Sequence, residues 1–341
     1  MGNHRGGTTL LQAMLSSHSA ITIPPETGFF AEVWPRRKRF GDLSVPQNLE
    51  RMFDFLESDF CSVSDLRFNR ECVMEGFRQT DQTCADLFVA LLSDYAVARG
   101  KRRAGEKSPQ HIFCVPTLAE LYPQARFITL IRDPRGVVCS ELQTAWGSKS
   151  VGRIARKWCR TVDQHERLRQ QQPPGRYLQI RYEDLLSSPE TVLRRACEFL
   201  GEEFEPAMLT YFERPEAERG FRTDEIWKAN TLRPLEQQRV AAWQQVLGPE
   251  QIALVERWAG GRMANFGYEP AGCANVSARL ALQFRIADRI RWTSELLSAL
   301  VRPRRRRTPW MTAIAEAAFS SARVSQKDDA TFRTDKTAAR P

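Results

Sequence analysis

Two glycines at the start of the chain constrain its fold more than any other feature. Gly2 and Gly7 have the G-x-x-x-x-G spacing of a phosphate-binding loop, and the sequence continues directly into an expected helix over residues 8–17. Glycines let backbone N–H groups approach an anion closely, and a helix N-terminus favours negative charge. The loop therefore predicts an anion site, although a glycine-rich turn that only caps a helix would have a similar sequence.

The two residues after the loop narrow its chemistry. A nucleotide triphosphatase would carry Lys and then Ser or Thr, with Lys on the terminal phosphates and the hydroxyl on Mg²⁺. Here the pair is Thr8 and Thr9, and the nearby cation is Arg5, inside the loop. The loop thus suits a phosphate-like group without the usual metal, which disfavours a P-loop nucleotide kinase or ATPase. Mg²⁺-dependent turnover of ATP would revive that alternative.

A second anion position follows the apolar run RFITLI at residues 126–131. Ligands of open α/β sheets bind just beyond the carboxyl ends of the strands, where this run places Arg132. Ser140 lies two helical turns further along. An arginine fork and a hydroxyl together can hold a phosphate. The alternative is that Arg132 forms a structural ion pair with Asp133 or another carboxylate.

The fold class follows from short apolar runs that alternate with amphipathic segments. This pattern predicts an α/β fold with a mostly parallel, P-loop-type sheet flanked by helices. We expect strands at 20–23, 126–131 and 177–180, and helices at 8–17, 84–99, 136–146, 152–172, 189–200, 234–247, 249–259 and 279–301.

The first strand of such a sheet is missing or truncated in this sequence. A phosphate loop normally follows a central apolar strand, but here only Met1 precedes Gly2. We expect that the natural protein begins further upstream. A chain without that strand could also be a non-catalytic nucleotide-binding relative.

Five short motifs together resemble the superfamily of sulfotransferases that use 3′-phosphoadenosine 5′-phosphosulfate (PAPS). The likeness covers roughly residues 2–270. RGGTTLL resembles the 5′-phosphosulfate loop, and IRDPRGVVCS resembles the 3′-phosphate element. GEKSP and RYEDL resemble segments of the glycosaminoglycan and related bacterial members. LSSH followed by PET resembles the segment that carries the general base in tyrosylprotein and heparan sulfotransferases.

The resemblance implies a role for particular residues. Glu26 would be the general base and Lys107 a cationic helper, while His18 and His111 are rival bases. The bland alternatives are that Glu26 is an acid at a helix N-terminus and that Lys107 is a solvated lysine. The donor would be held by Arg5, Gly6, Gly7, Thr8 and Thr9 at its 5′ end, by Arg132 and Ser140 at its 3′ end, and by Tyr182 and, through a loose alignment, Lys228.

The chemistry of sulfuryl transfer agrees with these roles. It resembles phosphoryl transfer, in which catalysis is mostly positioning and electrostatics. Arg5 and Lys107 would supply fixed positive charge, and Glu26 would take the proton of the acceptor hydroxyl, so no metal is expected. The acceptor stays open among carbohydrate, lipid-linked glycan, peptide tyrosine and small metabolite. We expect its pocket in loops of residues 36–79.

Charge and cysteine content set the expected partners. The formal net charge is +9, but five positives lie in residues 302–307, so the remainder is only mildly basic and shows no nucleic-acid-binding pattern. There is no long apolar run and no visible secretory signal. The eight scattered cysteines predict buried free thiols in a reducing compartment and no zinc site, which favours a cytoplasmic protein.

The C-terminal part differs in character from the rest. We expect a sulfotransferase-like domain over 1–270, a basic helical extension over 271–319 and a disordered tail over 320–341. Residues 279–307 could contact an anionic membrane surface peripherally, although a helix packed on the body with a solvated basic end is the favoured interpretation. The sequence does not indicate an oligomeric state.

Overall fold

All described strand pairs run in parallel, in a computed structural model that describes every residue except 59–60, 174, 215–228, 230, 273–277 and 302–341. β3 (Phe127–Ile131) pairs with β4 (Tyr177–Arg181) over their full lengths. β1 (Ile21–Thr22) pairs with β2 (Arg103–Ala104). The expected α/β fold with a parallel sheet is therefore confirmed.

The start of the chain joins this sheet beside β3. Gly2 forms an isolated parallel bridge with Leu130. The amino group of Met1 donates to the carbonyl of Ile128 at 2.9 Å, and Leu130 N–H donates to the carbonyl of Met1 at 2.9 Å. A Cβ on Gly2 would lie 2.4 Å from the carbonyl oxygen of Leu130, so only glycine allows this close pairing. Where a phosphate loop normally follows a full strand, Met1 and Gly2 attach this loop to the sheet.

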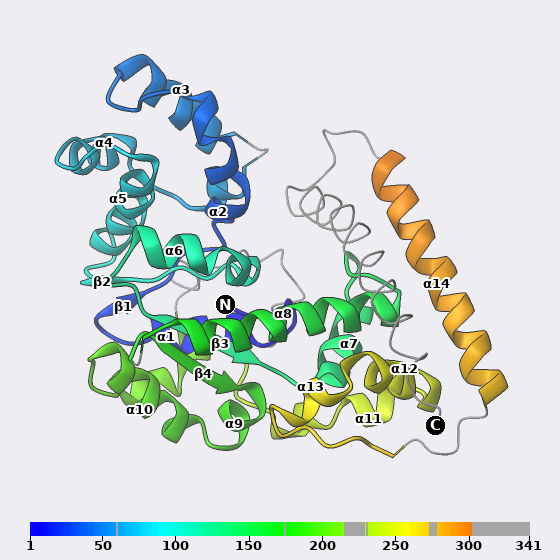
Figure 1. The fold of residues 1–341 in the computed structure, drawn as a ribbon. Helices are drawn as coiled ribbons and strands as arrows, with labels where there is room; N and C mark the ends of the chain where they lie inside the picture. The colour runs from blue at the N-terminus through cyan, green and yellow to red at the C-terminus, as the bar shows by residue number, and fades with distance from the viewer. Residues whose placement is uncertain (59–60, 174, 215–228, 230, 273–277, 302–341) are drawn as a thin grey trace, which may run out of the picture. The chain divides into compact units, whose positions relative to one another are not determined.

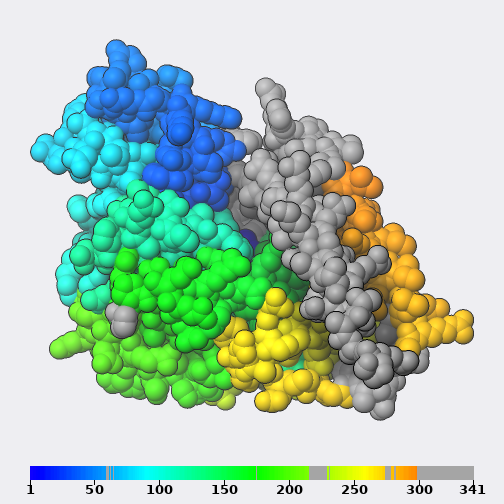
Figure 2. All heavy atoms as spheres, viewed as in Figure 1, coloured from blue at the N-terminus to red at the C-terminus, as the bar shows by residue number. Residues whose placement is uncertain are grey.

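Helices cover the sheet and form three buried clusters. One cluster joins α1, β3, β4, α9 and α10. A second joins α7, α8 and α12 around Trp158. The third joins α2 to α6 around Phe29 and Phe53, and the blue and cyan segments that carry α2 to α5 form one contiguous group of atoms (Figure 2). In the ribbon view β3 and β4 lie among α1, α8, α9 and α10, and the segment that carries α2 to α5 lies above them (Figure 1).

Most expected helices are present, with small shifts at their ends. The bounds of the helices of more than four residues are α1 Thr8–Ser16, α3 Pro46–Leu56, α4 Arg70–Arg78, α5 Cys84–Val97, α6 Val115–Leu121, α7 Pro134–Leu142, α8 Val151–Gln171, α9 Tyr182–Ser187, α10 Pro189–Leu200, α12 Pro249–Ala259 and α14 Ala278–Val301. The four-residue helices are α2 Phe29–Glu32, α11 Trp243–Val246 and α13 Gly261–Ala264.

Two expectations about local structure were wrong. The single helix expected over 234–247 is a 3₁₀ turn, Gln237–Val240, followed by α11. The loops expected over 36–79 contain α3 and α4, whose buried residues, such as Phe53 and Phe77, pack into the third cluster. In that segment the apolar residues recur at helical spacing, so the signal was present in the sequence.

Side chains fix the starts of the two helices that follow β3. Asp133 accepts from Arg135 N–H at 2.8 Å and caps α7. Ser150 accepts from Arg153 N–H at 3.2 Å and caps α8. Asp288 of α14 accepts from Val151 N–H at 2.6 Å, so it also satisfies this helix end. The N-terminal part of α14 is therefore bonded to the sheet-bearing unit.

The chain divides into two compact units, 1–292 and 293–341. The structure describes the second only as far as Val301, the end of α14. The expected boundaries at 270 and 319 stay predictions, and most of the proposed tail lies outside the described residues. None of the described helices is both long and apolar enough to cross a bilayer.

The described cysteines are free thiols. Cys61, Cys139, Cys159 and Cys197 are buried as expected, but Cys72 is exposed. Burial raises the pKa of the Cys61 thiol to about 12, which keeps it protonated at neutral pH. Cys273 lies outside the described residues.

Candidate functional site

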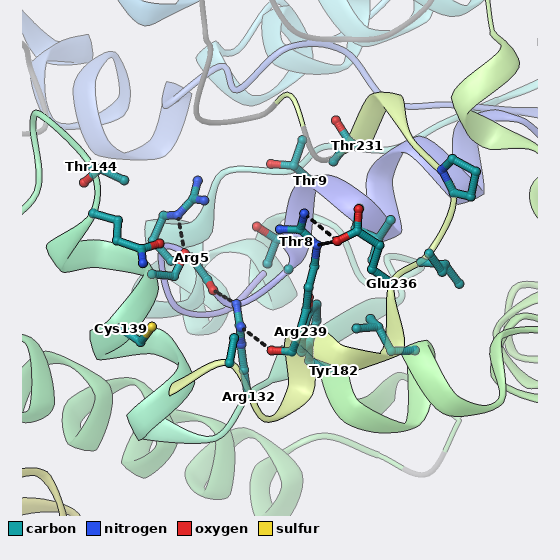
Figure 3. Close-up of a pocket in the computed structure, with 18 of the residues that line it drawn as sticks. Arg5, Thr8, Thr9, Arg132, Cys139, Thr144, Tyr182, Thr231, Glu236 and Arg239 are labelled. Atoms are coloured by element: carbon teal, nitrogen blue, oxygen red, sulfur yellow. Dashed lines mark hydrogen bonds and ion pairs between the residues drawn. The ribbon is translucent and has the colours of Figure 1, made fainter. Parts of the chain in front are cut away.

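A cleft of about 330 Å³ lies between the phosphate loop and the residues that follow β3. Figure 3 shows the side chains of Arg5, Arg132 and Arg239 gathered around it. Ser140 of α7 also lines this cleft. The two anion positions predicted from distant parts of the sequence thus share one cavity.

Arg5 connects the two sides of the cleft. Its backbone is left-handed, with φ of 62°, and its Nε donates to Ser140 Oγ at 3.0 Å. Its carbonyl accepts from Arg132 Nη1 at 3.1 Å. Burial lowers the pKa of Arg5, and the neighbouring Arg132 lowers it further. Two cations held this close together favour an anionic ligand between them.

The structural ion pair between Arg132 and Asp133, which the sequence allowed, does not form. The carboxylate of Asp133 is occupied by Arg135, whose Nη2 donates to it at 2.7 Å. Arg132 instead donates to the carbonyls of Arg5 at 3.1 Å and Arg239 at 3.4 Å. Carbonyl oxygens orient the guanidinium without neutralising it, so its charge is directed at the cleft.

Tyr182 forms the wall behind Gly7. The guanidinium of Arg132 lies 4.2 Å from the centre of the Tyr182 ring, a cation–π contact that orients the arginine. Gly7 has φ of 93°, and a Cβ there would lie 2.4 Å from the ring. The loop therefore needs glycine at position 7 for its conformation and for the close approach of Tyr182. Arg181 ends β4 and Tyr182 begins α9, so RYEDL lies at a strand end, as the resemblance implied.

The loop residues differ in their access to the cleft. Gly7, Thr8 and Thr9 line it, and as the N-cap and first turn of α1 they carry N–H groups that lack intrahelical acceptors. Gly6 does not line the cleft, because its N–H donates to the carbonyl of Asn3 at 3.0 Å. Its predicted role as a donor to the ligand therefore has no support from this geometry.

Glu26 and Lys107 form an ion pair next to Thr9. Lys107 Nζ donates to Glu26 Oε1, and it lies 3.4 Å from Thr9 Oγ1. The Lys107 side chain is only 6% exposed and that of Glu26 is 30% exposed. The alternative of a solvated lysine is therefore wrong. Thr9 links this pair to the cleft, because it contacts Lys107 and also lines the cavity.

The two histidines weighed as rival bases have partners on both ring nitrogens. His111 Nδ1 lies 2.8 Å from a carboxylate oxygen of Glu106, and its Nε2 accepts from Phe30 N–H at 3.2 Å. His18 Nδ1 accepts from Ala20 N–H at 3.0 Å, and its Nε2 lies 2.7 Å from the carbonyl of Glu203. Through these bonds, both imidazoles hold nearby backbone groups in place.

Sequence reasoning missed two residues beside the cleft. Arg239 lines it, and its Nε donates to Glu236 Oε2 at 2.9 Å. The expected late basic residue, Lys228, lies outside the described residues. The basic residue after position 230 was visible in the sequence. It was missed because no side chain of the helix expected over 234–247 was assigned to a site. Among the described residues, no group of three or more His, Cys, Asp or Glu is arranged to hold a metal.

Comparison with known proteins identifies the family. The sequence model of the Sulfotransferase family matches residues 1–206, which contain both the phosphate loop and the Arg132 element. The chain belongs to this family. The suspected resemblance to this family is therefore confirmed.

The curated relatives of this chain include proteins that are named for two different acceptors, tyrosine and a hydroxylated menaquinone. Protein-tyrosine sulfotransferase 1 of Danio rerio is 24% identical over 82% of this chain and 70% of its own length. Nodulation protein NoeE of Sinorhizobium fredii is 31% identical over 43% of this chain and 31% of its own length. Omega-hydroxy-beta-dihydromenaquinone-9 sulfotransferase Stf3 of Mycobacterium tuberculosis is 34% identical over 28% of each chain. The chain thus matches less than a third of the length of the last two.

Solved structures with the same fold include two sulfotransferase domains. The domain from the Synechococcus PCC 7002 olefin synthase has a TM-score of 0.53 and 23% identity, over 76% of this chain and 92% of that one. The domain from the curacin biosynthetic pathway has a TM-score of 0.53 and 20% identity, over 79% and 96%. At this identity the likeness concerns the fold alone.

Proposed function

We propose that this sulfotransferase moves a sulfuryl group from PAPS to a hydroxyl of its acceptor. The observation that carries the proposal is the shared cleft of Arg5 and Arg132, with the Glu26–Lys107 pair reached through Thr9. Two anion sites in one cavity suit a nucleotide that is charged at both its 5′ and 3′ ends.

The donor would lie across this cleft. Arg132 and Ser140 would bind the 3′-phosphate, because an arginine fork and a hydroxyl suit its oxygens. Thr8 and Thr9, at the first turn of α1, would bind the 5′-phosphosulfate. Arg239 would add a third cation, and the role expected of Lys228 stays a prediction. Arg5 lies between the two ends of the nucleotide, so its charge would serve both.

The transfer itself needs little from the protein beyond charge and geometry. The bond between sulfur and the 5′-phosphate oxygen breaks, and its electron pair stays on the phosphate. The acceptor oxygen forms the new bond to sulfur, and its proton passes to Glu26. Lys107, which is paired with Glu26 before the reaction, would stabilise the negative charge that builds on the sulfuryl oxygens and leaving oxygen.

The acceptor class is the open part of this proposal. The relatives named above act on tyrosine in one case and on a hydroxylated menaquinone in another, by their names. A carbohydrate, a peptide tyrosine and a small metabolite all offer the nucleophilic hydroxyl that Glu26 would deprotonate. The carboxylate of Glu26 is more accessible than the buried Lys107, so it is the part of the pair that such a hydroxyl would meet first.

Two measurements test the proposal. Calorimetry should show binding of adenosine 3′,5′-bisphosphate, and ³⁵S-labelled PAPS should give a labelled product with a member of an acceptor panel. Glu26→Gln and Lys107→Ala should bind the bisphosphate but lose transfer. Binding without any labelled product would point to a non-catalytic relative, and Mg²⁺-dependent ATP turnover would point to a nucleotide kinase; either result overturns the proposal.

A further inference from the structure

Glu106 lies at the centre of a buried network between the two segments that carry the Glu26–Lys107 pair. Its Oε1 accepts from Ser108 Oγ at 2.5 Å and from Thr27 Oγ1 at 3.0 Å, and its Oε2 lies 2.8 Å from His111 Nδ1. Glu106 directly precedes Lys107, and Thr27 directly follows Glu26. Each partner of the catalytic pair is thus flanked by a residue of this network.

The network also captures the backbone that follows Glu26. Gly28 N–H donates to Ser108 Oγ at 2.9 Å, and Phe30 N–H donates to His111 Nε2 at 3.2 Å. Because Nε2 accepts, Nδ1 carries the proton in the neutral ring and donates to Glu106. Ser108 likewise donates its proton to Glu106 while it accepts from Gly28. Ser108 and His111 therefore connect the carboxylate of Glu106 to the backbone of the segment that follows Glu26.

The network is buried, so the loss of any of its hydrogen bonds is costly. Ser108 and Thr27 are 0% exposed and His111 is 1% exposed, so lost bonds in the network would not be replaced readily by water. Burial alone would raise the pKa of Glu106, but His111 and the hydroxyls of Ser108 and Thr27 outweigh it and lower that pKa to about 2. The carboxylate is ionised at neutral pH and acts only as an acceptor.

We propose that Glu106 is a positioning residue, which acts through Ser108 and His111 to hold the segment of Glu26 against the segment of Lys107 and so fixes the geometry of that pair. The inference rests on the proposed function for the roles of Glu26 and Lys107. The donor cleft is held by other contacts, namely those of Arg5 and Arg132. Loss of Glu106 should therefore affect transfer much more than donor binding.

The first test is Glu106→Gln, which keeps the shape but replaces one acceptor oxygen with a donor. A misplacement of about 1 Å at a catalytic group costs about 10²-fold, so we expect kcat to fall by about that factor. KM for PAPS and the affinity for adenosine 3′,5′-bisphosphate should change little. Glu120→Gln, at an exposed position on α6, is the matched control and should leave kcat unchanged.

A second measurement does not depend on activity. Reductive methylation of Lys107, followed by peptide mass spectrometry, reports how well the lysine is held in its buried ion pair. We expect methylation about tenfold faster in Glu106→Gln than in wild type, because the segments separate locally. The control lysine, Lys101, donates to the carbonyl of His18 and should react at an unchanged rate.

The Ser108 variants cover the case in which Glu106→Gln does not fold. Ser108→Ala removes both bonds of the hydroxyl and should lower kcat, whereas Ser108→Thr keeps the hydroxyl and should restore most of it. An unchanged methylation rate of Lys107 in Glu106→Gln, or in Ser108→Ala, would overturn the positioning role. If the wild type binds the bisphosphate but sulfates no acceptor, the proposed function fails, while the methylation result still decides the role of Glu106.

Discussion

The two ends of the site hold their charges in opposite ways. In the donor cleft, Arg132 is oriented by backbone carbonyls and by the ring of Tyr182, so its charge stays available. At the transfer end, Lys107 is paired with Glu26 and held by a buried polar network. The donor cleft is thus built to attract an anion. At the transfer end the cation and the carboxylate neutralise each other in an ion pair.

The largest expected effect is on the transfer end, in Lys107→Ala. Removal of one preorganised charge that stabilises the transition state costs about 10²- to 10³-fold, so kcat should fall by about that factor while donor affinity stays within a few fold. Steady-state kinetics and calorimetry with adenosine 3′,5′-bisphosphate measure the two effects. Lys101→Ala is the control. A large loss of donor affinity with normal kcat would place Lys107 in the donor cleft and contradict the distinction between the two ends of the site.

Acid should lower the unfolding free energy of the wild type more than that of Glu106→Gln, which lacks the Glu106 charge. A carboxyl whose pKa is lowered in the folded state contributes stability that is present above its unfolded pKa and lost as the pH falls through the folded value. For Glu106 that window runs from about 4.5 down to about 2, and the contribution is about 3 kcal/mol.

Urea unfolding of wild type and Glu106→Gln at several pH values between about 4.5 and about 2 measures this contribution of Glu106 to stability. The difference in unfolding free energy between the two proteins should shrink as the pH falls. A difference that does not vary with pH would show that the charge of Glu106 is not stabilised in the folded protein.

In the donor cleft, Arg132→Ala should weaken binding of adenosine 3′,5′-bisphosphate by about 30-fold. A hydrogen bond to a charged group contributes about 1.5–3 kcal/mol, and alanine removes the fork that would hold the phosphate. Calorimetry at low and at moderate salt checks this, with the exposed Arg167→Ala as control. Equal affinity of the two variants would contradict the assignment of the 3′-phosphate.

The smallest effect separates backbone strain from packing in the phosphate loop. Gly7 and Gly175 both have positive φ, 93° and 84°, but only Gly7 has a neighbour, the Tyr182 ring, where a Cβ would lie. Alanine at either position pays the conformational penalty, and at Gly7 overpacking adds about 1–3 kcal/mol. Thermal unfolding of Gly7→Ala and Gly175→Ala gives the difference; equal losses would mean that Tyr182 moves aside freely.

The sequence predicted the donor end better than the transfer end. The glycine spacing, the apolar run before Arg132 and the hydroxyl at Ser140 are local signals, and parallel strands bring their carboxyl ends to one edge of a sheet. The network of Glu106 joins residues about 80 positions apart, Thr27 with Glu106 and Gly28 with Ser108, and no local pattern encodes that contact. His111 was considered as a base, because its neighbours in space were unknown.

Local sequence by itself determined the parallel α/β fold, the phosphate loop and the positions of Arg5 and Arg132, because these depend on short-range periodicity, glycine conformation and strand ends. Only the tertiary structure decided that Arg132 is held by the carbonyls of Arg5 and Arg239 and that Arg239 borders the cleft. It also decided that Lys107 is buried against Glu26. The physical reason is that each of these depends on which polar groups compete for the same partner, and that competition exists only after distant segments have packed together.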